Sequence, residues 1–411
     1  MSPVKITKCR ISGSENLIKV ASLGDQVLTG VFPKSTDQEV TCGPLDLVWC
    51  PDSGLLQLGH NYDLGEMYGP NYGYRSGLNA TMVEHLCTKV GQIVSRMELT
   101  SGDLVLDIGS NDGTLLSFYR QSGLIRVGMD PSGAKFKKYY ATDIDLIPDF
   151  FSSHEFQMRF NVKAKVITSI AMFYDLEVPA NFVRDVRECL AKDGIWHFEQ
   201  SYMPTMLRCN AYDTICHEHL EYYSFAVVQR LLESEGLKII DVQMNSVNGG
   251  SFAVTATHRS STHHRVNSAV IDWLIEQEEC MNLASLETYK SFEDRIQAHR
   301  RDLLSLIRSL RADGKKIVGY GASTKGNVLL QFCGFNADDI SCIAEVNPDK
   351  FGSITPGTHI PIVSEAEARS ISPDYMLVMP WHFRDSIIRR EAEFVAKGGK
   401  LIFPLPDIEI I

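Results

Sequence analysis

The sequence of 411 residues has no long apolar run, no excess of basic residues and no complete Cys-x-x-Cys motif. The first absence excludes a membrane-spanning helix. The net charge of −11 excludes a broad nucleic-acid-binding surface, because such a surface needs clustered lysine and arginine. The opening MSPVKITKCRIS lacks the apolar core of a signal peptide. We therefore expect a cytoplasmic protein with reduced thiols, and neither a membrane nor a nucleic acid as its partner.

Two segments, CRISGS from Cys9 and CPDSGL from Cys50, each resemble half of a four-thiolate zinc site. Such a site uses Cys-x-x-Cys twice, whereas Ser12 and Ser53 stand at the second ligand position here. A hydroxyl is a poor ligand for zinc, so a structural zinc ion is left open and we assign no residue as a metal ligand. We expect the two segments to meet and to be held by hydrogen bonds and packing.

The sequence divides into three parts by composition and periodicity. Residues 1–77, rich in Gly, Pro, Asp and Tyr, predict a small, loop-rich domain of short strands that resembles a zinc ribbon. Strand and helix patterns then alternate over 78–262 and again over 263–411, which predicts two Rossmann-like α/β domains with mostly parallel sheets. The second of these α/β domains begins with a predicted long interdomain helix over 265–312. The predicted fold class is therefore α/β with a small additional N-terminal domain.

The segment VLDIGSNDG places an acidic residue at the end of a strand, with glycines two and six positions later. This D-x-G-x-x-x-G spacing is typical of class I S-adenosylmethionine (SAM) methyltransferases, and a helix is expected after it. It is not the G-x-G-x-x-G of dinucleotide-binding proteins. A second acid ends the next strand, where a carboxylate can bind a ribose diol, and PDFF at 148–151 is the predicted adenine wall. An ordinary strand–turn–helix is the alternative. The predicted cofactor-binding residues are Asp107, Gly109, Asn111, Gly113, Asp130, Asp149, Phe150 and Ser169.

A second site is predicted in NAYDTICHEHLEYYS, residues 210–224, which holds two histidines, three glutamate or aspartate side chains and three tyrosines. His217 and His219 are too close in sequence to share one helix face, so this is not the HExxH helix of a zinc protease. In a loop, His219 can act as a general base because the unperturbed pKa of histidine lies near neutrality. Glu218 could orient a histidine or bind a sugar hydroxyl. A polar loop with backbone-bonded histidines is the alternative.

The segment GYGASTKGN follows a strand and opens a helix. Backbone N–H groups together with Ser323, Thr324 and Lys325 at a helix N-terminus form a natural phosphate cradle. Glu345, at the end of the next strand, could bind a ribose hydroxyl or a base edge. This arrangement predicts a second, nucleotide-bearing ligand. The alternative is a Rossmann-like domain that only packs.

The order of these motifs, with YGYRSG between the first and second domains and D-x-I-x-x-E-H before the third, resembles the nucleotide-sugar C-methyltransferases that make branched deoxysugars. The resemblance covers the whole chain. It implies SAM as the cofactor and a nucleotide-diphosphate-linked 4-keto-6-deoxy sugar as the substrate, methylated at C-3. It further implies that His219, with Glu218 beside it, removes the proton next to the keto group, so that an enolate attacks the SAM methyl group. Tyr74 would help to hold the sugar.

Two departures from the family pattern stand out. In the family an aromatic hydroxyl precedes the acidic pair, whereas Cys216 and His217 occupy that neighbourhood here, and Phe173–Tyr174 stands where the family has a histidine on the central strand. Tyr222 or Tyr223 could supply the missing hydroxyl. Two alternative functions stay open: an O-methyltransferase, and a non-catalytic module that binds SAM and a nucleotide. The chain is expected to be a monomer or a homodimer. The substrate-binding residues that the resemblance implies are Tyr72, Ser76, His217, Ser323, Thr324, Lys325, Asn327, Glu345 and Lys350.

Overall fold

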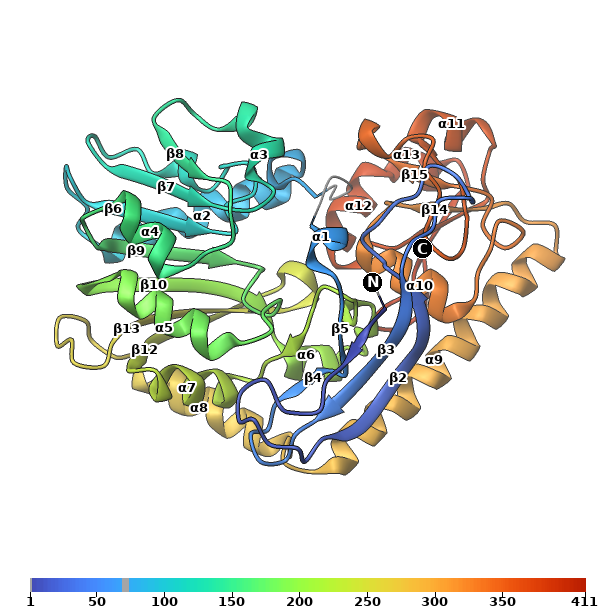
Figure 1. Ribbon diagram of the computed structural model, residues 1–411. Coiled ribbons are helices and arrows are strands. Elements are labelled where there is room, and N and C mark those ends of the chain that lie inside the picture. Colours follow the sequence, from blue (N-terminus) through green and yellow to red (C-terminus); the bar gives the residue numbers. More distant parts are fainter. Residues whose placement is uncertain (1, 69–73) are drawn as a thin grey trace.

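The computed structural model describes residues 2–68 and 74–411 and shows two α/β lobes with a smaller sheet beside them (Figure 1). The central lobe, cyan to green, lies on the left, and the C-terminal lobe, orange to red, lies on the right. The N-terminal strands, in blue, lie along the long helix α9 (Leu286–Ala312). Within the two described ranges, every helix is too short or too polar to cross a membrane.

The N-terminal part forms an antiparallel sheet with the order β11-β4-β3-β2. Its first strands are longer than the sequence predicted, because β2 has 10 residues and β3 has 8. In β3 buried and less buried residues alternate, as expected for a strand that packs one face against a core. The edge strand β11 comes from the loop 210–224, so this loop is fixed to the N-terminal domain. The strands and the short helix here are β1 (Val4–Lys5), β2 (Ile18–Val27), β3 (Cys42–Trp49), β4 (Leu56–Leu58), β5 (His60–Asn61), α1 (Leu64–Met67) and β11 (Glu221–Tyr222).

The central sheet has seven strands in the order β12-β13-β10-β9-β6-β7-β8. The five strands from β10 to β8 in this order are parallel, and β13 and β12 extend the sheet antiparallel. All five residues of β6 are buried, because helices cover both faces. The strands are β6 (Leu104–Ile108), β7 (Ile125–Met129), β8 (Ile144–Ile147), β9 (Ala164–Ile170), β10 (Leu190–Ser201), β12 (Leu237–Asn245) and β13 (Ser251–His258). The helices are α2 (Ala80–Arg96), α3 (Gly133–Phe136), α4 (Ser153–Arg159), α5 (Pro179–Cys189), α6 (Met203–Arg208), α7 (Phe225–Ser234) and α8 (Ser268–Cys280).

The C-terminal sheet has six strands in the order β16-β15-β14-β17-β18-β19, of which only β19 is antiparallel to its neighbour. Both large sheets therefore have the Rossmann-like character that the sequence predicted. The strands are β14 (Ile317–Tyr320), β15 (Ile343–Glu345), β16 (Ile362–Ser364), β17 (Tyr375–Val378), β18 (Lys400–Phe403) and β19 (Glu409–Ile410). The helices after α9 are α10 (Thr324–Cys333), α11 (Glu365–Ser370), α12 (Arg384–Arg390) and α13 (Ala392–Ala396).

Two predicted helices differ from the structure. The segment after Gly113 forms only a 3₁₀ turn, Leu116–Phe118, because Asp112 accepts hydrogen bonds from the backbone and hydroxyl of Thr114 and so competes with helix formation. The predicted helix over 265–312 is two helices, α8 and α9. Asn282, in the left-handed conformation, ends the first, and Ser285 caps the second. Helix α8 packs against β12 and α7 of the central domain, whereas α9 packs against β2 and α10.

Candidate functional site

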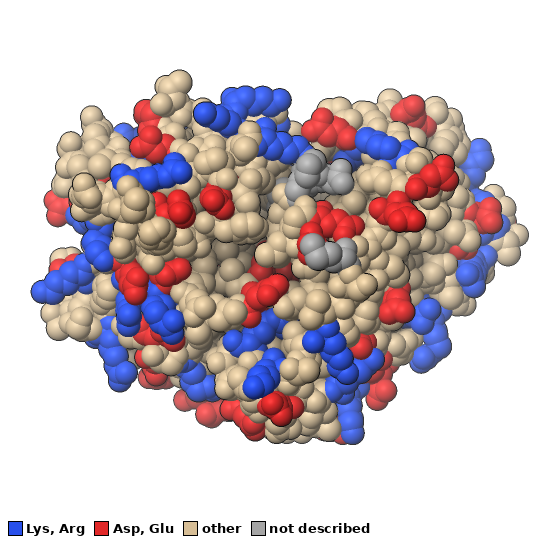
Figure 2. Space-filling model, in the orientation of Figure 1, with Lys and Arg blue, Asp and Glu red and all other residues tan. Residues whose placement is uncertain are grey.

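A cavity of about 1220 Å³ opens where the three parts of the chain meet. In Figure 2 the surface is hollowed between the left and right lobes, and acidic and basic side chains are interspersed around the hollow. The carboxyl ends of β6 and β7 face this cavity from one side and the β14–α10 loop faces it from the other, as expected for ligand sites of open α/β sheets. The predicted residues that line it are Tyr74, Ser76, Asp107, Gly109, Asn111, Asp130, Phe150, Glu218, His219, Ser323, Thr324, Lys325, Glu345 and Lys350.

The loop after β6 is tied to both β7 and the interdomain segment through Asn111. The backbone N–H of Asn111 donates to Asp130 Oδ2 at 2.8 Å. Its side-chain amide donates to the Tyr74 carbonyl at 3.2 Å and accepts from the Ser76 N–H at 2.9 Å. Gly109 has a φ of 72°, which favours glycine. Asn111 therefore positions the Tyr74–Ser76 segment at the cavity, a role that the sequence motif did not predict.

The acidic side chains at this end of the cavity fit a cationic cofactor. Asp107 accepts a hydrogen bond from Thr168 Oγ1 at 2.6 Å. Burial and the nearby negative charge of Asp130 nevertheless raise the pKa of Asp107 to about 7. A positively charged group would relieve this repulsion and ionise the carboxyl. SAM carries positive charge on its sulfonium and amino groups and has no phosphates, so the residues present fit it.

His219 lies in the loop between α6 and β11 and faces the cavity. Its Nδ1 donates to the Thr214 carbonyl at 2.8 Å, which assigns the proton to Nδ1 and leaves the lone pair on Nε2. The ring packs on that of Tyr174, with 4.2 Å between the centroids. Burial and the charge of Lys325 lower the pKa of His219 to about 3, so the ring is neutral at pH 7 and its Nε2 is less basic than that of a solvated histidine. The prediction of a general base started from the near-neutral unperturbed pKa of histidine, and burial of the loop lowers the pKa of His219 well below that value.

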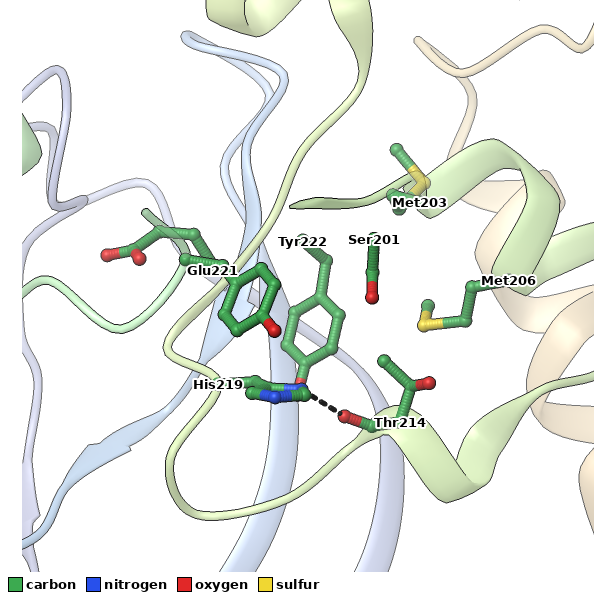
Figure 3. A pocket seen from close by; sticks show the side chains of 8 residues that line it. Ser201, Met203, Met206, Thr214, His219, Glu221 and Tyr222 are labelled. Atoms are coloured by element: carbon green, nitrogen blue, oxygen red, sulfur yellow. Dashed lines mark hydrogen bonds between the residues drawn. The ribbon is translucent and has the colours of Figure 1, made fainter. Parts of the chain in front are cut away.

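A second, much smaller void of about 10 Å³ lies behind His219 (Figure 3). Thr214 and Tyr222 lie beside the histidine, with Met203 and Met206 on the far side. The void is only large enough for a water molecule. Tyr222 is buried and does not line the large cavity. The structure thus contradicts its assignment as a catalytic hydroxyl, because pairing of β11 with β4 turns the ring into the core.

The C-terminal loop forms the other wall of the cavity. Ser323 caps α10 by accepting from the Gly326 N–H at 3.0 Å, so its hydroxyl oxygen is already engaged as a helix cap. Glu345 accepts from the Ala322 N–H at 2.8 Å and from two backbone N–H groups after β15. Both acid–glycine sites therefore share one construction, in which the strand-end carboxylate holds the neighbouring glycine loop.

The two lysines of this wall lie in the cavity, and each donates one of its three N–H groups to a carbonyl. Lys325 Nζ donates to the Asn248 carbonyl of the central domain at 2.7 Å. Lys350 Nζ donates to the Ala322 carbonyl at 2.7 Å and lies over the ring of Phe32. Burial lowers the pKa of both lysines, so an anion beside them would restore the charged form. Each ammonium keeps further donors for such an anion.

Two predicted substrate-binding residues connect domains and do not line the cavity. His217 is fully buried, and its Nε2 donates to the Gln26 carbonyl at 3.2 Å. Asn327 is also buried, and its amide donates to the Thr29 carbonyl at 2.7 Å. Both predictions were wrong because the end of β2 covers these side chains. Gln26 lies nearly 200 positions from His217 in the sequence, and Thr29 lies nearly 300 positions from Asn327, so neither contact could be derived from a local pattern.

Three predicted cofactor residues also lie outside the cavity lining. Asp149 is exposed and bonds the N–H of Phe150, so Phe150 and Phe151 alone supply the side chains of the PDFF segment that line the cavity. Ser169 is fully buried and accepts from the Trp196 indole. Gly113 is required by its φ of 76° and by the ring of Tyr140, which a β carbon would approach to 2.9 Å. Tyr72 falls outside the described residues.

Other residues of the cavity escaped the sequence analysis. Asp175 lines the cavity and follows β9, the strand beside β6. An acidic residue after that strand is the sequence signal that could have identified it. Glu199, near the end of β10, bonds His85 at 2.6 Å and Lys89 at 2.8 Å. Although burial opposes its ionisation, these partners lower the pKa of Glu199 to about 2, so it is an anchor for α2. Gly30 brings the N-terminal domain to the cavity.

The two cysteine motifs meet, as the sequence predicted. Cys9 Sγ lies 3.2 Å from Ser53 Oγ, and Ser12 Oγ lies 3.7 Å from Cys50 Sγ. Two thiols and two hydroxyls do not match the donor set of a structural zinc site. In the part of the chain that the structure describes, no three His, Cys, Asp or Glu side chains are grouped as metal ligands would be. Hydrogen bonds cross-link the two turns here.

Comparison with known proteins covers all three parts. A family model described as the C-methyltransferase C-terminal domain matches residues 246–406, one for a methyltransferase domain matches 82–242, and one for a zinc binding domain matches 9–68. The chain is 34% identical over 411 residues to the C-methyltransferase NovU of Streptomyces niveus. The alignment covers 99% of this chain and 97% of NovU.

Solved structures resemble part of the chain. Magnesium protoporphyrin IX methyltransferase (ChlM) of Synechocystis PCC 6803 with bound SAM is 14% identical and has a TM-score of 0.33, covering 43% of this chain and 79% of ChlM. Mitomycin 7-O-methyltransferase MmcR is 15% identical and has a TM-score of 0.34, covering 42% of this chain and 53% of MmcR. The family matches and the full-length relative show that the chain belongs to the family of SAM-dependent C-methyltransferases.

Proposed function

We propose that this methyltransferase acts on a nucleotide-diphosphate-linked 4-keto-6-deoxy sugar and methylates the carbon next to the keto group, C-3. The observation that carries the proposal is the single cavity that joins Asp107 and Asp130, His219, and the loop at Ser323. Its volume of about 1220 Å³ exceeds the roughly 300–1,000 Å³ of an ordinary ligand pocket, so a cofactor and a nucleotide sugar have room together.

The proposed reaction begins with proton removal by His219. A keto group acidifies the neighbouring C–H bond, and the Nε2 lone pair of the neutral imidazole accepts the proton. The C–H electrons form a carbon–carbon double bond, and the carbonyl electrons move to oxygen to give an enolate. When bound, SAM would supply an electrophilic methyl group: the enolate carbon would bond to this methyl as its bond to sulfur breaks, which leaves S-adenosylhomocysteine. The Thr214 carbonyl keeps the ring in the tautomer that this step needs.

The C-terminal wall supports recognition of the nucleotide diphosphate. Backbone N–H groups at the start of α10 and the remaining donors of Lys325 and Lys350 favour a negatively charged group. Glu345 lines the same wall, and we propose that the nucleoside binds beside it. Negative charge from the diphosphate would also offset the effect of Lys325 on His219 and raise the basicity of the histidine.

The proposal is tested by incubating the protein with SAM and a panel of 4-keto-6-deoxy sugar nucleotides. We expect a product heavier by one methyl group, identified by mass spectrometry, with the new carbon attached to C-3 by NMR. In D₂O, substrate recovered from incubation with S-adenosylhomocysteine is expected to carry deuterium at C-3.

His219→Asn should abolish both exchange and methylation. His154→Asn, a change of an exposed histidine on α4, serves as the matched control and should alter neither. Methyl transfer to a hydroxyl oxygen without exchange would instead identify an O-methyltransferase. No product from any keto sugar nucleotide would contradict the proposed substrate class.

A further inference from the structure

Arg10 belongs to the first cysteine motif, and its side chain lies inside the protein with only 3% of its area exposed. The turn that carries it is held against the second motif by the Cys9–Ser53 and Ser12–Cys50 contacts. The two motifs therefore determine where the guanidinium group of Arg10 enters the core.

The guanidinium group of Arg10 contacts two segments that are far apart in the sequence. Its Nη1 donates to the Leu58 carbonyl at 2.7 Å and reaches the Leu220 carbonyl at 3.5 Å. Its Nη2 donates to the His60 carbonyl at 3.4 Å. Its Nε lies 3.7 Å from Glu221 Oε1. One planar group therefore joins the N-terminal domain to the two residues that follow the proposed base.

Glu221 depends on Arg10 for a partner of opposite charge. Its side chain is fully buried, and neither carboxyl oxygen has a hydrogen-bond partner among the described residues. Burial raises the pKa of Glu221, and the charge of Arg10 opposes this rise. Removal of one partner from a buried ion pair leaves the other uncompensated. Arg10 therefore holds the Glu221 side chain at this place in the core.

The ring of His219 is oriented by the same stretch of backbone. The N–H groups of Leu220 and Glu221 donate to the Tyr174 carbonyl at 2.8 and 3.0 Å. The Tyr174 ring packs on the histidine, and the Thr214 carbonyl accepts from its Nδ1. In Figure 3 the Glu221 carboxyl points away from His219, so its effect on the ring passes through the backbone. A shift of this backbone would redirect Nε2.

We propose that Arg10 is a positioning residue for His219: its guanidinium group fixes Leu220 and Glu221 and so sets the direction of the Nε2 lone pair toward the substrate. This inference deepens the proposed function and rests on it for the role of His219 as the base. An arginine suits this position because its planar fork carries five donors and stays charged when buried. The two cysteine motifs thereby acquire a role in the reaction, since their turns place this arginine.

The first test follows His219 itself and needs no substrate. In protein labelled with ¹⁵N at histidine, the Nδ1–H that bonds the Thr214 carbonyl should give an NMR resonance protected from water, identified by its absence in His219→Asn. Arg10→Met keeps a side chain of similar length without the guanidinium group, and the resonance should be lost as the loop moves and the proton exchanges. Arg96→Met is the matched control. It breaks the ion pair with Asp241 outside the cavity lining and should keep the resonance.

The second test measures enolate formation with S-adenosylhomocysteine and the 4-keto sugar nucleotide in D₂O. Exchange at the carbon next to the keto group should fall about 100-fold in Arg10→Met, as expected for a base displaced by about 1 Å. The KM for the sugar nucleotide in methyl transfer should stay near its wild-type value, because the C-terminal wall is unchanged. Arg10→Lys keeps a charge beside Glu221 but lacks the planar fork, so it should fold and lose exchange by about tenfold. Arg96→Met should exchange at the wild-type rate.

Binding of S-adenosylhomocysteine, measured by calorimetry, shows that each variant is folded. A wild-type His219 resonance with wild-type exchange in Arg10→Lys would overturn the inference. Equal losses in Arg10→Met and Arg96→Met would also overturn it, because Arg10 would then contribute stability alone. Absence of exchange and of methylation in the wild type, with every keto sugar nucleotide, would overturn the proposed function. The resonance would still report whether Arg10 orders the loop that carries His219.

Discussion

Gly30 lies directly against the carboxyl group of Glu218. A β carbon on Gly30 would stand 2.1 Å from Glu218 Oε1 and 3.5 Å from Thr324 Oγ1. The three residues come from the N-terminal domain, the loop of the central domain and the C-terminal domain. The candidate site is therefore assembled by all three parts of the chain, and a β carbon at position 30 would require the Glu218 carboxyl group to shift.

Gly30→Ala should displace Glu218 and lower kcat/KM for the keto sugar by about 10- to 100-fold, as a displacement of about 1 Å does elsewhere. SAM affinity should not change, because the cofactor residues lie after β6 and β7. Gly91→Ala is the control, since this glycine on α2 has open space for a methyl group. A Gly30→Ala protein with wild-type kinetics would show that Glu218 moves at no cost to the reaction.

The two predicted cofactor acids should differ in their effect on SAM binding. Asp130→Ala removes the acceptor that holds the Asn111 and Ser132 N–H groups, and SAM affinity measured by calorimetry should fall by at least about tenfold. Asp149→Ala changes an exposed carboxyl outside the cavity and should leave the affinity unchanged. Weaker SAM binding by Asp149→Ala would show that Asp149 contacts the adenine of SAM after all.

What could be predicted from sequence depended on how local the contact is. Asp107, Gly109 and Asp130 follow strands in a fixed pattern, so their position at one edge of the sheet could be derived from short segments. His217 and His219 are equivalent in sequence terms. Their separation depends on β2, which covers His217, and this contact joins residues 191 positions apart. Asp175 differs, because its place after β9 was a local signal, although its hydrogen bond with Tyr68, 107 positions away, could not be read from the sequence.

The pH dependence of stability should reveal the buried His217. Burial lowers its pKa to about 4, whereas in the unfolded chain the pKa is near 6.5. Between these values the unfolded chain binds the extra proton, so stability is lost as the pH falls through this window. The loss attributable to this residue is about 1.4 kcal/mol per pH unit. At neutral pH both states carry the neutral ring, so this loss is absent and the stability is at its full value.

This can be measured by urea unfolding at pH 7 and pH 5. His217→Gln should be less stable than wild type at pH 7, because its contacts with the N-terminal domain are lost, but its free energy of unfolding should fall less on acidification, by about 2 kcal/mol. His154→Gln should keep the wild-type dependence on pH. An unaltered slope in His217→Gln would mean that the folded protein protonates His217 readily.

The paired cysteine motifs allow a test by restoration of the zinc site. Cys9, Ser12, Cys50 and Ser53 already meet through two cross-linking contacts, so Ser12→Cys and Ser53→Cys together create four thiols at positions that face one another. Zinc prefers four such ligands, and its binding stabilises the folded state. We expect the double variant to bind one zinc ion per chain by metal analysis and to lose thermal stability when a chelator is added.

The wild type and the Cys9→Ser variant should bind no stoichiometric zinc, and a chelator should not change their thermal midpoints. Each single variant, with three thiols, should bind zinc more weakly than the double variant. One tightly bound zinc ion in the wild type would show that the serines do not exclude the metal. Methyl transfer should be similar in the wild type and the zinc-loaded double variant, because none of these four residues lines the large cavity.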